Sequence, residues 1–91
     1  MSENTTSSSV AALFAADGRL VSIPRKAARR EQLLDHLAGT LFEPGTAYTE
    51  KQVNEALSTV HEDFPALRRY LVESSRLTRT RDGSSYRRTA A

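Results

Sequence analysis

The fold of this chain is decided by residues 48–88, which read YTEKQVNEALSTVHEDFPALRRYLVESSRLTRTRDGSSYRR. Toward the end of this stretch, residues 77–81 and 84–89 flank the dipeptide Asp82-Gly83. Asp-Gly is favoured in two-residue hairpin turns, because both turn positions accept positive φ angles. The sequence therefore predicts a two-stranded β-hairpin, with one face carrying Leu77, Arg79 and Tyr86.

Two helix patterns precede this hairpin. Thr49 and Gln52 have the spacing of a capping box, in which each side chain bonds the other residue's backbone N–H at the start of a helix. After a break at residues 61–63, Asp63 is placed to cap the second helix, and Pro65 is tolerated in its first turn. Apolar residues recur at helical spacing, so we expect burial of Val53, Ala56, Leu57 and Val60 in the first helix and of Phe64, Leu67 and Leu71 in the second.

A third helix pattern lies upstream, over about residues 25–38. Pro24 suits its start, and Gly39 is predicted to end it. Before it, residues 19–23 predict a short strand or extended segment, and residues 10–14 predict a short additional helix that ends at Asp17-Gly18. The apolar face expected for the helix over residues 25–38 carries Ala27, Leu33, Leu34, Leu37 and Leu41.

Together these elements predict an α+β fold of the winged helix-turn-helix type. It would have three core helices plus a C-terminal two-stranded β-hairpin, with a short extra N-terminal helix. The 91 residues allow one domain, which we place at residues 10–89. Residues 1–9 are rich in Ser and Thr and show no apolar periodicity, so we expect a disordered tail there.

The net charge is only +2, but the charges are segregated along the chain. Bases gather in residues 25–30 and 68–88, whereas acids dominate residues 31–63. Apart from Lys26 and Lys51, every base is an arginine, whose planar fork of donors suits phosphate or carboxylate partners. This segregation favours an anionic partner over a merely solvated surface.

In a winged helix, the exposed face of the last core helix would enter the DNA major groove and the hairpin would contact the backbone. We therefore expect Arg69 and Arg76 to read guanine or phosphate, with Ala66 and Tyr70 flanking this face. Glu73 opposes the hypothesis, unless its carboxylate accepts from a cytosine amine or pairs with Arg69. The hairpin would supply phosphate contacts from Arg79, Arg81, Arg87 and Arg88.

Several motifs together resemble one bacterial family. They are FAADGRLVSIP at residues 14–24, FEPG at 42–45, YTEKQVN at 48–54, HEDF at 61–64, and LRR with LV at 67–69 and 71–72. Over about residues 13–88 the chain is similar to the domain-of-unknown-function family 2087 (DUF2087). Domains of this family occur alone or joined to helix-turn-helix regulators, so the resemblance implies a link to transcription. It implies no known reaction, ligand or catalytic residue.

The sequence offers no catalytic constellation, so we expect a protein that is not an enzyme. His36 and His61 fall on different predicted elements and match no metal-ligand spacing. The absence of cysteine excludes disulfides and thiolate metal sites, and it fits a reducing cytoplasm. No segment has the ~20 apolar residues of a membrane span. We accordingly predict no catalytic residue, no metal, no cofactor, no small-molecule ligand and no membrane partner.

Two classes of function stay open. The first is a DNA-binding regulator, expected to be a homodimer because one such module makes few base contacts. The second is a non-enzymatic protein-interaction or regulatory domain of the same fold. It would hold a protein partner through the Arg-rich hairpin or through the acidic residues Glu50, Glu55 and Glu62. RNA binding is a weaker third option, because the three phenylalanines Phe14, Phe42 and Phe64 are assigned to the core.

Overall fold

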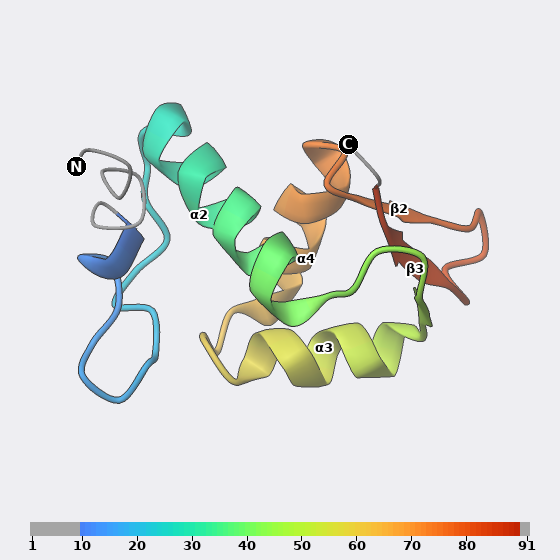
Figure 1. The fold of residues 1–91 in the computed structure, drawn as a ribbon, viewed down its shortest axis with the longest axis horizontal. Helices are drawn as coiled ribbons and strands as arrows, with labels where there is room; N and C mark the ends of the chain where they lie inside the picture. The colour runs from blue at the N-terminus through green and yellow to red at the C-terminus, as the bar shows by residue number, and fades with distance from the viewer. Residues whose placement is uncertain (1–9, 90–91) are drawn as a thin grey trace.

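The structure is a computed structural model that describes residues 10–89 (Figure 1). This part of the chain is α+β, with three named helices and one three-stranded antiparallel sheet. The helices are α2 (Ala27–Leu41), α3 (Glu50–Ser58) and α4 (Phe64–Glu73). The strands are β1 (Ala47–Tyr48), β2 (Leu77–Arg79) and β3 (Tyr86–Arg88). In Figure 1 the β2–β3 hairpin lies beyond α4, on the side away from α2.

Helix α2 begins two residues later than its sequence pattern predicts and continues through Gly39 to Leu41. The prediction that Gly39 ends the helix was therefore wrong. A glycine inside a helix costs about 1 kcal/mol relative to alanine, and here the continuation brings Phe42 into the core with 2% exposure. Ala27, expected on the apolar face, lies exposed in the first turn instead.

The starts of α3 and α4 confirm the predicted caps. Thr49 Oγ1 accepts from the Gln52 N–H at 3.1 Å, and Gln52 Oε1 accepts from the Thr49 N–H at 2.9 Å. Asp63 Oδ1 accepts from the Ala66 N–H, and Pro65 lies in the first turn of α4. Because these bonds join residues three apart, the local sequence is enough to specify them.

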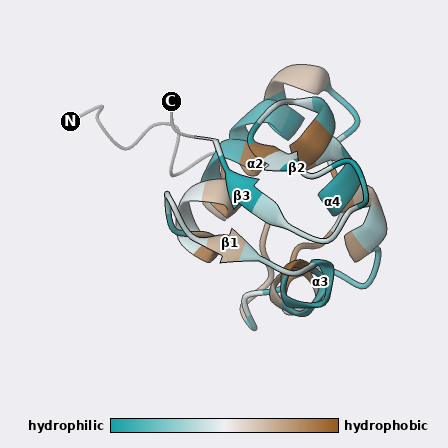
Figure 2. Ribbon diagram, turned by 90° about the vertical axis from the view of Figure 1, so that its right-hand side faces the viewer, coloured by the Kyte–Doolittle hydropathy of each residue, from teal (hydrophilic) through white to brown (hydrophobic). Residues whose placement is uncertain are grey.

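The sheet has the order β1-β3-β2, so that β3 pairs with both other strands (Figure 2). Strand β1 was not predicted. It pairs Ala47 with Arg87 and Tyr48 with Tyr86, which links the segment before α3 to the hairpin. Tyr48 packs edge-on against Phe42 at 5.3 Å between ring centroids, and its hydroxyl accepts from the Glu43 N–H at 2.8 Å.

The hairpin has the predicted register, with Thr78 opposite Arg87 and Arg79 opposite Tyr86. Its tip is wider than a two-residue turn, because the backbone pairing ends where the Thr80 N–H donates to the Ser85 carbonyl. The Ser84 N–H instead donates to Thr80 Oγ1 and Asp82 Oδ1. Gly83 has a φ of +75°, as expected for the glycine of this turn.

The N-terminal segment differs from its sequence pattern. Of the helix predicted over residues 10–14, Val10 and Ala11 are helical, and the chain then turns and forms an isolated bridge between Phe14 and Leu20. Leu20 is buried at 5% exposure, whereas Val21 is 68% exposed, so residues 19–23 have the alternation expected of an extended segment without a regular strand. The predicted tail at residues 1–9 lies outside the described residues.

The core lies between the three helices and the inner face of the sheet. All six central positions predicted from the helix stripes are at most 1% exposed: Leu33, Leu37, Val53, Leu57, Leu67 and Leu71. Leu77 and Tyr86 close the core on the hairpin side. Phe64 and Phe14 are only partly buried, and Ala66, expected on the flank of the exposed face, points inward with 9% exposure.

Candidate nucleic-acid interface

A cleft of about 440 Å³ separates α4 from the hairpin and the start of α3. We call it the α4–hairpin cleft. Three of its lining residues are arginines and two are glutamates, so the cleft is polar with a small excess of positive charge. Its lining consists of Glu50, Pro65, Arg68, Arg69, Val72, Glu73, Arg79 and Tyr86.

A polar network fixes one wall of this cleft. The Tyr86 hydroxyl donates to Glu50 Oε1 at 2.9 Å, and Glu50 Oε2 lies 4.0 Å from Arg68 Nη1. Arg68 also donates to Asn54 Oδ1, so its guanidinium is held on α3. Burial of the phenol, together with its bond to the Glu50 carboxylate, raises the pKa of Tyr86. The network therefore joins β3, α3 and α4 at the cleft.

Arg68 and Tyr86 were not expected in a functional site, and Glu50 was expected only among the acidic residues that could hold a protein partner. Glu50 is the first residue of α3, and the predicted hairpin register had placed Tyr86 on one face with Leu77, packed on the helices. The bond between them spans 36 residues of sequence, and no local pattern encodes such a pairing. The exposed first-turn position of Glu50 was the one available signal, since a carboxylate there also favours the helix dipole.

Arg69 and Glu73 lie one turn apart on the exposed face of α4, as predicted. Arg69 points past Tyr70, with its guanidinium carbon 5.7 Å from the ring centroid. Arg30 of α2 stacks on the same ring at 4.7 Å. Within residues 10–89, neither Arg69 nor Glu73 takes part in an ion pair.

Arg76, the other arginine expected to read DNA, is already paired with two carboxylates of α2. Its Nε donates to Asp35 and its Nη1 to Glu31, each at 2.6 Å, and its side chain is 18% exposed. These two carboxylates of α2, above all Asp35, raise the pKa of Arg76. We call this group the arginine clamp. It ties the end of α4 to α2 and leaves Arg76 unsuited to a further anionic partner.

Of the four hairpin arginines, one is bonded within the fold and three are exposed. Arg88 is half-buried and donates to the Phe42 carbonyl at 3.2 Å, so it supports the fold. Arg87 is exposed on the opposite side of β3. Arg79 is exposed on the cleft side, directly across the ladder from Tyr86. Arg81 is exposed in the tip.

The tip is ordered by the carboxylate of Asp82. Asp82 Oδ1 accepts from the Ser84 N–H at 3.0 Å and from the hydroxyls of Ser84 and Thr80 at 2.8 Å each. These bonds, above all the backbone one, lower the pKa of Asp82 to about 2. A side-chain carbon added at Gly83 would lie 3.7 Å from Glu50 Oε1 and 3.8 Å from Arg79 Nη1, so the tip borders the cleft.

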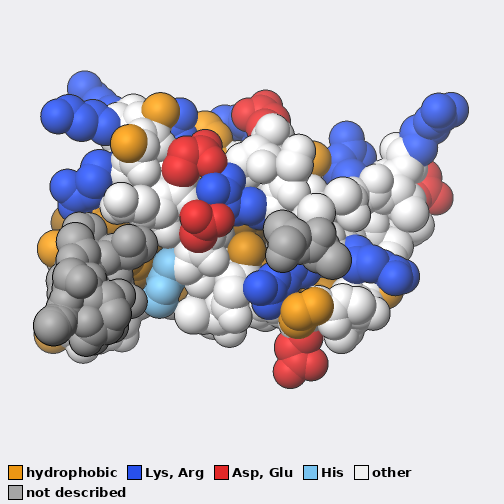
Figure 3. All heavy atoms as spheres, turned by 45° about the horizontal axis from the view of Figure 1, so that its top comes forward, with side chains coloured by type: hydrophobic (Ala, Val, Ile, Leu, Met, Phe, Trp, Pro, Cys, Tyr) orange, Lys and Arg blue, Asp and Glu red, His pale blue; other side chains and the backbone are white. Residues whose placement is uncertain are grey.

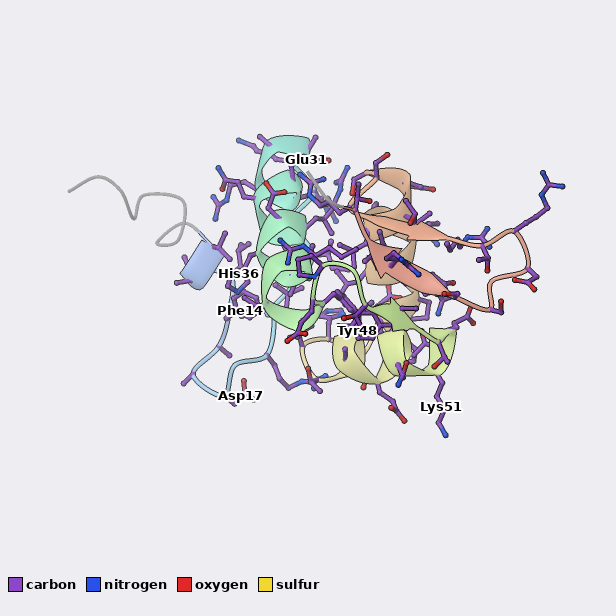
Figure 4. The ribbon with its side chains drawn as sticks, turned by 45° about the vertical axis from the view of Figure 1, so that its right-hand side comes forward. Phe14, Asp17, Glu31, His36, Tyr48 and Lys51 are labelled. Atoms are coloured by element: carbon purple, nitrogen blue, oxygen red, sulfur yellow. The ribbon has the colours of Figure 1, made fainter. Side chains whose placement is uncertain are left out.

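Basic side chains are spread over the surface and do not form one patch. Figure 3 shows them at both ends and in the middle of one face of the molecule, with acidic groups among them. Arg25, Lys26 and Arg29 are exposed at the start of α2, far along the chain from the hairpin. On α3, Lys51 points away from the body of the domain (Figure 4).

The histidines have local structural roles. The ring of His36 packs against Phe14 at 5.6 Å between centroids (Figure 4), and His61 Nδ1 accepts from the Asp63 N–H at 2.9 Å. Among residues 10–89, no group of three His, Cys, Asp or Glu side chains could hold a metal ion. No helix in the same range has the length and hydrophobicity needed to cross a membrane.

The structure thus defines a small α+β domain with an arginine-bearing cleft between its last helix and a hairpin. Residues 19–88 match the family model described as an uncharacterized protein conserved in bacteria, DUF2087. The chain belongs to this family, which confirms the resemblance found in the sequence. No curated protein and no solved structure shows significant similarity to the chain.

Proposed function

We propose that this chain is a transcription-associated winged-helix domain that binds double-stranded DNA. The order helix, strand, helix, helix, strand, strand supports this fold, as does the pairing of the first strand with the last. Helices α3 and α4 would form the helix-turn-helix, with α4 as the recognition helix and β2–β3 as the wing. The observation that carries the proposal is the α4–hairpin cleft, where arginines of both elements lie on one surface.

Each exposed arginine would have a distinct role. Arg69, on the outer face of α4, would reach base edges in the major groove. Arg79 and Arg81, on the hairpin, would contact phosphates of the DNA backbone. Arg87 is exposed on the other side of β3 and would reach the backbone only if the DNA extends past the hairpin. Arg76 and Arg88 are left out of the proposed interface, because carboxylates or a carbonyl already accept their N–H groups.

Mobility shifts with genomic DNA fragments at increasing salt would test this function. Each phosphate contact removed should flatten the salt dependence by about one unit of slope, equally for all sequences. We expect this loss for Arg79→Ala and Arg81→Ala. Lys51→Ala removes the same charge from a side chain that points away from the cleft, and it should leave the slope unchanged.

A protein-docking function is the alternative, and one observation favours it. The α4–hairpin cleft contains the carboxylates of Glu50 and Glu73 beside its arginines, and such mixed charge suits a protein surface. If the purified chain gives no mobility shift even at low salt, where a basic wing binds DNA most strongly, the DNA-binding proposal fails. The docking function would then replace it.

A further inference from the structure

Glu73 is a carboxylate on the surface that we propose meets DNA. It is the last residue of α4 and is exposed. It borders the α4–hairpin cleft on one side and a second cleft, between α4 and α2, on the other. Glu73 therefore lies at the C-terminal end of α4, on the outer crest between the two clefts and one turn beyond Arg69 on the same exposed face.

The Glu73 carboxylate does not form the ion pair with Arg69 that its position on α4 would allow. A glutamate one turn after an arginine often pairs with it, yet no ion pair joins Glu73 to Arg69 or to any other residue in the range 10–89. Arg69 and Arg30 both lie against the Tyr70 ring. Arg68 is held by Asn54 and lies beside Glu50. Glu73 is thus an exposed residue whose carboxylate takes part in no ion pair within residues 10–89.

The spacing of the two groups suits neighbouring base pairs. Residues four apart in a helix are separated by about 6 Å along its axis, and successive base pairs are about 3.4 Å apart. Arg69 and Glu73 can therefore face base pairs one or two steps apart. In the major groove arginine bonds the O6 and N7 acceptors of guanine, whereas glutamate accepts from the N4 amine of cytosine.

We infer that α4 reads two G·C pairs one or two steps apart, with Arg69 on the guanine of one and Glu73 on the cytosine of the other. This inference rests on the proposed DNA-binding function and names the chemistry of its target. Glu73 makes the interface selective, because its carboxylate repels any base that presents only acceptors at that position. The same charge weakens binding to all other DNA.

Selection of binding sites from a random DNA library, carried out in parallel with the full chain and with Glu73→Gln, would test this inference. Glutamine pairs with adenine through N6 and N7. We expect one position of the selected site to change from cytosine to adenine, and affinity for the original site to fall about 5- to 150-fold. Arg69→Ala should abolish the guanine preference at the other position. Glu55→Gln, which removes the same charge from exposed α3 outside the cleft, should change neither position.

The possible results of this selection distinguish failure of the proposed Glu73–cytosine contact from failure of DNA binding itself. If Glu73→Gln selects the same site as the full chain, the inference is overturned while DNA binding stands. If the variant binds all sequences more tightly by one common factor, Glu73 only repels phosphates and the inference is likewise overturned. If neither protein binds DNA at low salt, the proposed function itself fails. Within the described part of the chain the Glu73 side chain joins no ion pair, so circular dichroism of the variant should match that of the parent chain.

Discussion

Arg69 lies in α4 and Arg76 lies three residues after its end, yet the two side chains differ in burial and in partners. Arg76 is mostly buried and donates to two carboxylates of α2. Arg69 is exposed, with its guanidinium carbon 5.7 Å from the centroid of the Tyr70 ring. The number of arginines in a sequence therefore does not determine how much positive charge is accessible to a partner. The charge of Arg76 in the arginine clamp is neutralised by two carboxylates of the fold, whereas Arg69 and Arg79 at the α4–hairpin cleft stay exposed.

The hairpin also contains one arginine that is bonded within the fold and a neighbour that is exposed. Arg87 and Arg88 are consecutive in β3, so their side chains lie on opposite faces of the sheet. Arg88 donates to the Phe42 carbonyl, whereas Arg87 stays exposed. Arg76 and Arg88, the less exposed arginine of each pair, both donate to oxygen acceptors of the fold, because a cation that loses water needs such partners.

The largest effect should come from the core on which both regions rest. Leu67 is fully buried on the inner face of α4, so Leu67→Ala should lower the free energy of unfolding by about 2–5 kcal/mol. Val21→Ala is the matched control, because Val21 is 68% exposed and its truncation should cost less than about 0.5 kcal/mol. Urea denaturation followed by circular dichroism would measure both. Equal midpoints for the two variants would show that the inner face of α4 is assigned wrongly.

The clamp and the cleft should respond differently to loss of an arginine. Arg76→Ala removes two charge-assisted bonds and should cost about 1–2 kcal/mol of stability, with no change in the salt slope of DNA binding. Arg69→Ala should leave stability within about 0.5 kcal/mol and weaken DNA binding. Denaturation midpoints and mobility shifts on the same two proteins give the comparison. The division fails if Arg76→Ala is as stable as the parent chain.

Tyr86→Phe tests the wall of the cleft with a smaller effect. Loss of the bond to Glu50 should cost about 1 kcal/mol near neutral pH. Because the pKa of Tyr86 is raised in the folded state, the folded chain holds the phenolic proton more tightly than the unfolded chain. This contribution is fully present below about pH 10 and is lost as pH rises through the folded-state pKa.

Denaturation of the parent chain and of Tyr86→Phe at a series of alkaline pH values would measure this contribution. The parent chain should lose stability more steeply than the variant. Tyr48→Phe is a suitable comparison, since its hydroxyl instead accepts from the Glu43 N–H, outside the cleft. Parallel curves for the parent chain and Tyr86→Phe would contradict the assigned bond.

The smallest effect concerns the hairpin tip. The Asp82 carboxyl should titrate with a pKa of about 2, below its usual 3.8. Its stabilising effect is therefore present above about pH 4 and is lost as pH falls through about 2. Thr80→Val removes one donor, and it should move this pKa back toward its usual range. Side-chain carbon shifts in an NMR pH titration would show it, and an unchanged pKa in the variant would remove Thr80 from the tip network.

The sequence predicted the features that depend on residues close together in the chain. The capping box at Thr49 and the cap at Asp63 follow from bonds across three residues. The hairpin register follows from the position of Asp82-Gly83. The six central core residues follow from helical periodicity, because each lies on the only apolar stripe of its helix.

What the sequence did not predict depends on residues far apart in the chain. The partners of Arg76 lie 41 and 45 residues before it, so nothing near Arg76 distinguishes it from Arg69. Strand β1 has only two residues and no alternation of its own, and it forms because β3 offers a free edge. Gly39 has the local character of a helix stop, but burial of the apolar side chains on either side of it outweighs its intrinsic cost.

The place of β3 in the sheet has a consequence for how the chain folds as it is synthesised. The middle strand of the sheet is the last element within residues 10–89, and β1 and β2 pair with it and not with each other. While the ribosome still holds residues 86–88, the helices can collapse together but neither ladder can form. The late strand must then close a loop of about 40 residues to reach β1, a slow non-local step. Emergence of residues 86–88 therefore allows both ladders of the sheet to form in one late step.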